Sequence, residues 1–260
     1  MNNNIFKVQI KALTPIWTGD ANKKSSTLRE TGILGSLRWW YEALIRGLKG
    51  TACDPTDTKC DGKNHCDACE LFGCTGWARK FKLEVEKLDE ELIFKFIPLR
   101  EIVNVEWGLL NTTFNIISNY GALGAHIAQG NGVIKIIENK LSYQNEKLIR
   151  FSSNKESDDR LPNLNKFFFY NFHIKFTNSI SELINNKVFW THTPDHTNFT
   201  ENWDSWKKLW DNYHFLPIAF HIRDAIRHLE NDKDKRHDIF GRLGKGSKVF
   251  VSHGYKIDDK

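Results

Sequence analysis

The chain has 260 residues, of which 40% are hydrophobic and 27% charged, enough for one large or two small folded domains. No apolar run is long enough to cross a bilayer, and the N-terminus lacks the features of a secretory signal, so we expect a cytoplasmic protein without membrane contacts. The net charge of +5 is compatible with a phosphate-backbone partner but is not diagnostic of one.

The first half of the chain predicts the element order β-α-β-β-α-β. Apolar residues recur at three- and four-residue steps in the two predicted helices and alternate with polar ones in the strands. This order is that of the ferredoxin-like, RNA-recognition-type fold. In chain order, the predicted elements are a strand at 5–12, a helix at 32–49, strands at 81–85 and 92–99, a helix at 104–120 and a strand at 133–137.

The second half has weaker patterns in a similar order. A polar connection at 138–165 precedes a predicted strand at 166–176 (KFFFYNFHIKF), and helical periodicity at 203–229 is interrupted by Pro217. We interpret 233–238 as a solvated charge cluster, followed by a glycine-rich loop at 240–248 and a strand at 249–257. The sequence therefore predicts an α+β protein with two ferredoxin-like modules, 1–140 and 141–260, the second degenerate.

All five cysteines lie in an insert at 51–74, which has no hydrophobic period and is predicted to be a loop. Cys66 and Cys69 are spaced so that two thiolates can reach one tetrahedral ion, and Cys53 and Cys60 can supply the other two ligands. We therefore predict a structural Zn²⁺ site. Cys74 and His65 remain alternative ligands, and a set of free thiols that bind nothing is the competing interpretation.

The helix predicted at 32–49 is a candidate nucleic-acid contact. Gly32 and Gly35 in its opening turn permit close approach of another backbone, and free amides at a helix N-terminus suit a phosphate. Arg38 and Arg46 follow the polar face and are predicted to pair with phosphates, while Trp39 lies off the apolar stripe. A core helix with glycines that ease its entry explains the same spacing.

Several segments together resemble the RAMP superfamily of CRISPR-associated proteins, and within it the first RAMP subunit of the type III-B (Cmr) effector complex. The likeness covers most of residues 5–137 and again 239–257. The segments that carry it are LTPIWTGD, ETGILGSLRWWYEALIRGL, ACDPT, LFGCTGWARKF, YGALGAHIAQGNGVIKI and IFGRLGKGSKVFVSHGYK.

The resemblance implies a non-catalytic subunit that binds RNA in antiviral defence, beside other RAMP subunits. It would hold the 3′ region of the guide RNA together with the target RNA, and base pairing would read the sequence. The resemblance also implies that the glycine-rich loop near the first helix contacts an RNA backbone. The complete set of predicted RNA-binding residues is Trp17, Arg29, Gly32, Gly35, Arg38, Trp39, Arg46, Trp77, Gly124, Gln129, Gly130 and Lys245.

Two other functions remain open at this point. A metal-independent endoribonuclease of the same superfamily would use His126 or Asp20, although neither has a visible partner in the sequence. A purely structural module would dock its basic face onto an acidic protein patch. The glycine-rich stretches fit neither a dinucleotide-binding fingerprint nor a phosphate-binding loop, because strands rather than helices follow them.

Overall fold

The structure is a computed structural model that describes residues 6–19, 27–54, 60–88, 91–127, 131–141, 151, 161–170, 173–186, 203–242, 248–249 and 251–256. The chain divides into two compact units, Met1–Ala125 with Gly132–Tyr170 and His126–Asn131 with Asn171–Lys260. Residues 141–170, which the sequence assigned to the second module, therefore belong to the first unit.

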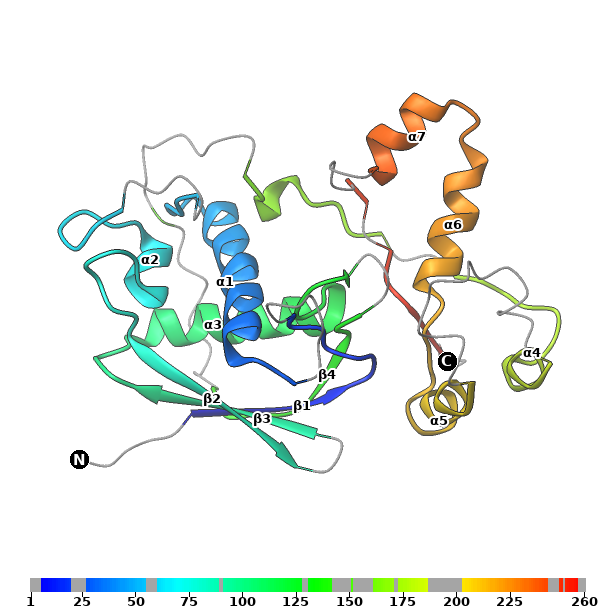
Figure 1. Ribbon diagram of the computed structural model, residues 1–260, viewed down its shortest axis with the longest axis horizontal. Coiled ribbons are helices and arrows are strands. Elements are labelled where there is room, and N and C mark those ends of the chain that lie inside the picture. The colour runs from blue at the N-terminus through cyan, green and yellow to red at the C-terminus, as the bar shows by residue number, and fades with distance from the viewer. Residues whose placement is uncertain are drawn as a thin grey trace. The chain divides into compact units, whose positions relative to one another are not determined.

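The first unit is built on a four-stranded sheet with the order β2-β3-β1-β4, in which every hydrogen-bonded pair is antiparallel. This is the strand order of a ferredoxin-like fold, and the predicted element order β-α-β-β-α-β is confirmed. Helices α1 and α3 cover one face of the sheet (Figure 1). The strands are β1 (Phe6–Ala12), β2 (Phe81–Leu88), β3 (Glu91–Pro98) and β4 (Ile134–Asn139), and the helices are α1 (Glu30–Gly47) and α3 (Asn104–Tyr120).

The core lies between the sheet and these two helices. Side chains alternate between the two faces of β1, and those of Val8 and Ile10 face the core, as predicted. Val8 lies opposite Phe94 in the antiparallel pair of β1 and β3. All four aromatic residues of β1 to β4 belong to this core: Phe6, Phe81, Phe94 and Phe96. The open face of the sheet therefore lacks the aromatic platform on which RNA-recognition domains stack bases.

The cysteine-rich insert contains a short helix, α2 (Asp67–Phe72), where the sequence predicted only a loop. Cys66 caps the helix, because its sulfur accepts a hydrogen bond from the backbone amide of Cys69. Leu71 and Phe72 are buried in the core. The missed helix is only six residues long, which is less than two turns and too short for a helical repeat of apolar residues to be recognised.

The second unit contains four helices and a two-stranded sheet among its described residues. The prediction of a second ferredoxin-like sheet is not met there, because β5 and β6 pair only with each other. Pro217 does separate β5 from α6, as predicted. The elements are α4 (Ile180–Asn185), α5 (Trp203–Tyr213), β5 (Phe215–Leu216), α6 (Ala219–Leu229), α7 (Lys233–Phe240) and β6 (Gly254–Tyr255).

One further local prediction was wrong. The described part of 166–176 forms no strand, because its first aromatic residues pack against α1 and α3 instead of a neighbouring strand.

The charged run at 233–238, predicted to be a solvated cluster, has no buried residue and forms most of helix α7. The Asp232 side chain accepts hydrogen bonds from the backbone amides of Asp234 and Lys235 and so caps this helix.

Within the described residues, none of the helices is both long and apolar enough to span a membrane.

Candidate metal centre and nucleic-acid interface

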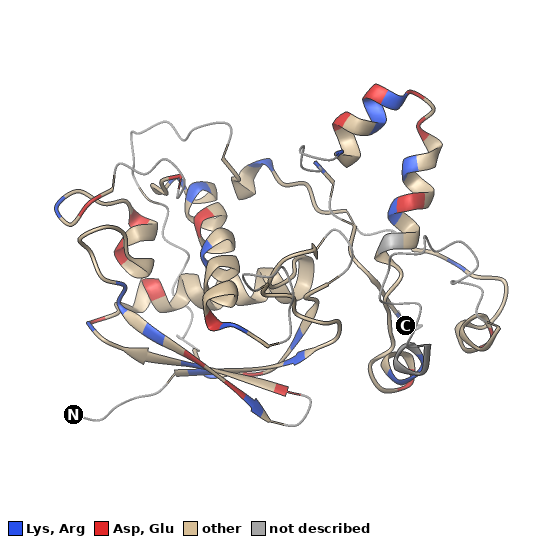
Figure 2. Cartoon of the chain, in the orientation of Figure 1, with Lys and Arg blue, Asp and Glu red and all other residues tan. Residues whose placement is uncertain are grey.

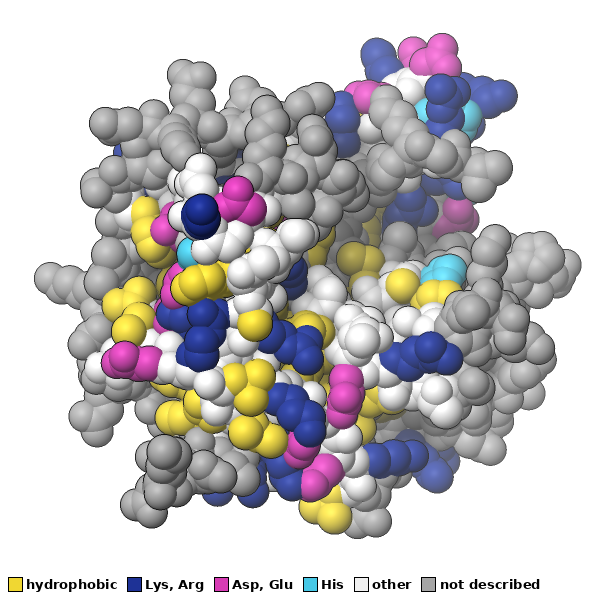
Figure 3. Space-filling view, turned by 60° about the vertical axis from the view of Figure 1, so that its left-hand side comes forward, with side chains coloured by type: hydrophobic (Ala, Val, Ile, Leu, Met, Phe, Trp, Pro, Cys, Tyr) yellow, Lys and Arg dark blue, Asp and Glu magenta, His cyan; other side chains and the backbone are white. Residues whose placement is uncertain are grey.

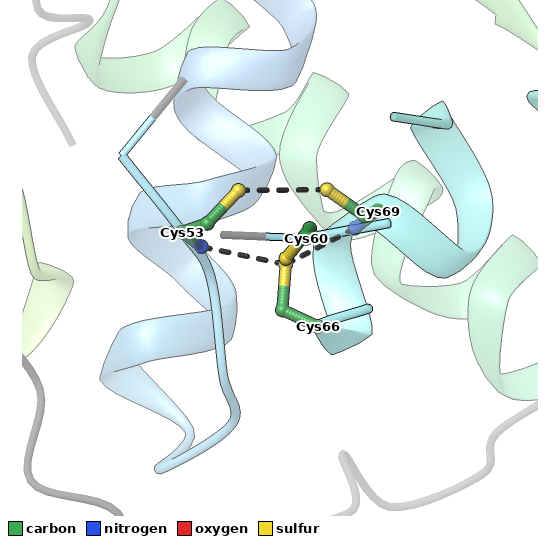
Figure 4. Close-up of side chains that lie close together, drawn as sticks. All are labelled: Cys53, Cys60, Cys66 and Cys69. Carbon is green, nitrogen blue, oxygen red and sulfur yellow. Dashed lines mark hydrogen bonds between the residues drawn. The ribbon is translucent and has the colours of Figure 1, made fainter. Parts of the chain in front are cut away.

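Four cysteines of the insert converge on one point (Figure 4). The sulfur atoms of Cys53, Cys60, Cys66 and Cys69 all lie within 4.8 Å of one another, and those of Cys53 and Cys69 are 3.5 Å apart. Four sulfurs around a tetrahedral Zn²⁺, each about 2.3 Å from the ion, lie roughly 3.8 Å from one another. The cluster therefore has the donor set and the spacing of a closed, structural metal site.

Backbone amides orient one of these sulfurs. The Cys66 sulfur accepts hydrogen bonds from the amides of Cys53, at 3.3 Å, and Cys69, at 3.4 Å. Contacts with the neighbouring thiols, followed by burial, raise the pKa of the Cys69 thiol. Four thiolates at this spacing repel one another unless a cation lies between them, which is the electrostatic condition that a bound metal meets.

The two alternative ligands lie outside the cluster of four. The Cys74 thiol donates to the carbonyl of Asp61, 3.6 Å away. The His65 imidazole bonds through Nε2 to Glu70 and stacks on Trp77. The geometry thus selects the four cysteines that the sequence ranked first.

Arg38 lies beside this cluster and not on an open surface. Its Nη2 donates to the Cys69 sulfur at 3.3 Å, its Nη1 to the carbonyl of Gly73 at 3.0 Å, and its Nε to Glu42 at 2.7 Å. Burial raises the pKa of the Glu42 carboxyl, and the bond from Arg38 opposes this. The predicted phosphate contact of Arg38 is therefore replaced by an internal contact between α1 and the insert.

Arg46 is excluded from RNA contact more firmly, because its side chain is buried. Only 4% of the residue is exposed. Its guanidinium donates to three backbone carbonyls, those of Ala52, Cys53 and Pro162, at 2.9–3.2 Å. The sequence placed both arginines on a solvent face of α1, but the insert and the segment at 161–167 cover that face.

The leading turn of α1 contacts another part of the chain. A Cβ at Gly32 would lie 2.8 Å from Cβ of Thr18, and the Thr18 hydroxyl accepts a hydrogen bond from the amide of Arg29. The close approach predicted at Gly32 is thus made by the chain itself. Together with the internal position of Arg38, this rules out the predicted arginine-lined phosphate cradle.

The first glycine-rich loop also approaches the chain's own backbone. Gly124 has φ +89°, and a Cβ there would lie 2.5 Å from the carbonyl oxygen of Trp17. The next amide, that of Ala125, donates to this carbonyl at 2.7 Å. Trp17 is half-buried and its ring packs against Gly19. The described contacts of Trp17 and Gly124 are therefore contacts within the protein.

Trp77 is half-buried as well. Its ring centroid lies 4.4 Å from that of His65 and 4.2 Å from the Arg100 guanidinium carbon. A base can stack on this ring only by displacing one of these two groups.

Three predicted residues remain accessible, all in or next to the first half of α1. Arg29 is exposed directly before the helix, a Cβ added at Gly35 would meet no atom within 4 Å, and 40% of Trp39 is exposed. Gln129, Gly130, Lys245 and the alternative catalytic residue Asp20 lie outside the described residues. His126 is exposed, with φ +57°.

Charge is not segregated on the described surface. Figure 2 shows basic and acidic residues interspersed along α1 and β2. On the face drawn in Figure 3, basic side chains alternate with hydrophobic and acidic ones. A nucleic acid bound to the face drawn in Figure 3 would therefore meet scattered cations together with apolar contacts.

Sequence reasoning predicted Trp39 but missed four further exposed aromatic residues, which are Tyr120, Phe168, Phe169 and Tyr170. We call these five residues the exposed aromatic surface. Its members come from α1, from the end of α3 and from the segment after a 3-10 turn, Leu164–Lys166. The run FFFY was the available signal, but it was interpreted as part of a strand.

Comparisons with known proteins identify a family, and the solved structures that match include a subunit of low similarity. The structure of Cmr1 from Pyrococcus furiosus in its apo form is 16% identical, covers 52% of this chain and has a TM-score of 0.36. The chain spans about half of that protein, 49% of its length. No curated protein matches the sequence. A sequence model of the RAMP superfamily matches residues 9–216, which is most of the chain, and the protein therefore belongs to the RAMP superfamily.

Proposed function

We propose that the protein is a non-catalytic, RNA-binding subunit of a type III-B CRISPR interference complex. In this proposal it holds the 3′ region of the guide RNA together with the target RNA and docks onto other RAMP subunits. Membership of the RAMP superfamily supports the proposal, as do the segments of the sequence that resemble the first RAMP subunit of that complex.

The observation that carries RNA binding is an exposed stripe on α1. Thr31, Gly35 and Trp39 follow one another at four-residue steps and all are exposed, whereas Ile33 and Leu37 face the core. Gly35 leaves room for a ligand backbone against the helix, and Trp39 offers a ring on which a base can stack. The stripe thus combines backbone access with a stacking surface.

We predict that Trp39→Ala weakens RNA binding about five- to hundredfold, because a base–aromatic stack contributes roughly 1–3 kcal/mol. Trp39→Phe keeps a ring and should lose much less. Leu88→Ala, which changes an exposed apolar residue of β2, is the matched control. Filter binding of labelled single-stranded RNA at several salt concentrations measures the effect.

The salt dependence separates RNA binding from the structural alternative. Phosphate contacts release counterions, so the affinity of an RNA-binding protein falls steeply as salt rises. If RNA affinity is weak, does not change with salt concentration and is the same in Trp39→Ala, the protein is better explained as a module that docks only onto other proteins.

Absence of catalysis is part of the proposal and has its own test. We expect labelled RNA to stay intact on prolonged incubation with the protein in the presence of a chelator. Cleavage that disappears in His126→Ala or Asp20→Asn would instead identify the metal-independent endoribonuclease.

We further propose that the metal of the cysteine cluster is a structural Zn²⁺. The four sulfurs fill all tetrahedral positions, so no open position remains for a catalytic water. Elemental analysis should find about one zinc per chain, and Cys66→Ser should lower this content while Cys74→Ser leaves it unchanged. Acidification should release the metal, because protons compete for the thiolates. A metal-free, fully folded preparation would contradict the assignment.

A further inference from the structure

In the segment at 167–170 the ring contacts join every second residue, Phe167 to Phe169 and Phe168 to Tyr170, and the backbone of Phe167 is extended. This is the pairing expected when successive side chains of an extended chain alternate between two sides. Phe167 and Phe169 anchor it to the first unit. The ring of Phe167 lies 6.2 Å from that of Trp39, and the ring of Phe169 lies 4.6 Å from that of Tyr120. The segment is therefore held in place by its odd-numbered residues.

The even-numbered residues are displayed to solvent. Phe168 is 87% exposed and Tyr170 is 72% exposed. Their ring centroids are 6.4 Å apart and their planes differ by only 14°. Most of each residue is therefore in contact with solvent.

This spacing fits a flat group inserted between the rings. Carbon atoms in van der Waals contact are about 3.5 Å apart, so a planar ring sandwiched between two others needs roughly 7 Å between the outer rings. The centroids lie 6.4 Å apart, so the two planes must separate by at least about half an ångström more, an adjustment that exposed side chains make by changing rotamer. Parallel planes at this distance suit a nucleobase, since every base presents two flat faces.

We propose that Phe168 and Tyr170 form an aromatic clamp for one unpaired RNA base. The proposal rests on the proposed RNA-binding function and adds a specific contact to it. Phe167 links the clamp to Trp39, so an RNA strand lying along the exposed stripe of α1 reaches the clamp without leaving the first unit. The clamp has no base-specific donor or acceptor among its two rings, apart from the Tyr170 hydroxyl, and so tolerates any base.

The test uses the full chain and single-stranded RNA that contains 2-aminopurine, whose fluorescence falls when it stacks. The wild type should quench the probe and bind it more tightly than the same probe in a perfect duplex. Phe168→Leu and Tyr170→Leu, which keep an apolar side chain but remove the plane, should each lose quenching and weaken binding about five- to hundredfold. Phe168→Tyr should retain both properties, and Leu99→Ala, a substitution at another exposed apolar position, should change neither.

The outcomes separate the clamp from RNA binding as such. If the wild type binds RNA and both leucine variants quench and bind equally well, the clamp is wrong while the proposed function stands. If the wild type binds no RNA, the clamp and the proposed RNA-binding function are both wrong. Leucine variants that bind RNA normally but lose association with another subunit would reassign the pair to protein docking and likewise overturn the clamp.

Discussion

Arg38 illustrates how a single side chain can join two parts of the fold. Its guanidinium donates to a sulfur of the cysteine cluster, to a carbonyl at the end of α2 and to Glu42 on its own helix. A tetrathiolate zinc site carries a net charge of about −2, and a neighbouring guanidinium offsets part of it. Arg38 therefore ties the insert to α1, and it would be a partner of the ligands of the proposed zinc.

We predict that Arg38→Gln weakens zinc binding about 10–100-fold, the usual effect of removing a partner of a metal ligand. The substitution also leaves Glu42 with only Arg46, 3.7 Å away, as a charged partner. Arg38→Lys retains the positive charge but not the several N–H donors of the guanidinium. Its zinc affinity should lie between those of the wild type and Arg38→Gln. Competition with a chromophoric chelator measures the affinity.

The control for Arg38→Gln is Lys63→Gln, which removes a positive charge from an exposed position in the same insert. Equal zinc affinity in Arg38→Gln and the wild type would show that the contact with Cys69 is incidental. A loss of RNA binding with zinc affinity intact would return Arg38 to the nucleic-acid interface.

For individual residues of α1, the sequence predicted which side chains face the sheet but not what covers the opposite face. Helical period correctly separated Ile33 and Leu37 from Arg38 and Arg46 on α1. It did not reveal that the insert would cover the polar face, because the insert itself has no period from which its path can be predicted. The grouping of Cys53, Cys60, Cys66 and Cys69 was predictable because a candidate metal site is recognised from residue type and spacing, which the sequence displays directly.

At the scale of elements, the two glycines at the start of α1 have different roles. Gly32 contacts Thr18, whereas the space around Gly35 is open. Glycine in the interior of a helix is less favourable than alanine by roughly 0.5–1 kcal/mol. Gly35→Ala should therefore raise the free energy of unfolding by about that amount, and Gly32→Ala should lower it by about 1–3 kcal/mol through overpacking.

Chemical denaturation of the two alanine variants measures this contrast. If Gly35→Ala is more stable but binds RNA less well, the open space at Gly35 is used by the ligand, as the proposed function requires. Equal destabilisation by both substitutions would contradict the assignment of different surroundings to the two glycines.

The strands show what a period of two can and cannot predict. It located β1, β2 and β3 to within a few residues, because each has one buried face. The aromatic run at 167–170, which was also predicted to be part of a strand, packs two of its side chains against α1 and α3 but pairs with no strand in the described structure. Strand pairing depends on a partner elsewhere in the chain, which local alternation does not specify.

At the scale of the whole molecule, the hydrophobic residues form two separate clusters. The larger one lies in the first unit, between the sheet and α1 and α3. The smaller one, built around Ile184, Leu216 and Ile218, lies in the second unit. Neither cluster draws its described members from the other unit.

We therefore predict that the protein unfolds in two steps, with the second unit unfolding first because its core is smaller. Removal of the proposed metal should destabilise the first unit, which unfolds in the later step. Ala68, Leu71 and Phe72 of α2 belong to the larger cluster, so loss of the metal loosens a helix that is packed into the core of the first unit. Calorimetry with and without a chelator should show the upper transition fall while the lower one stays. A single transition, or a chelator effect confined to the lower one, would mean that the insert and the two clusters are coupled differently from the way their contacts indicate.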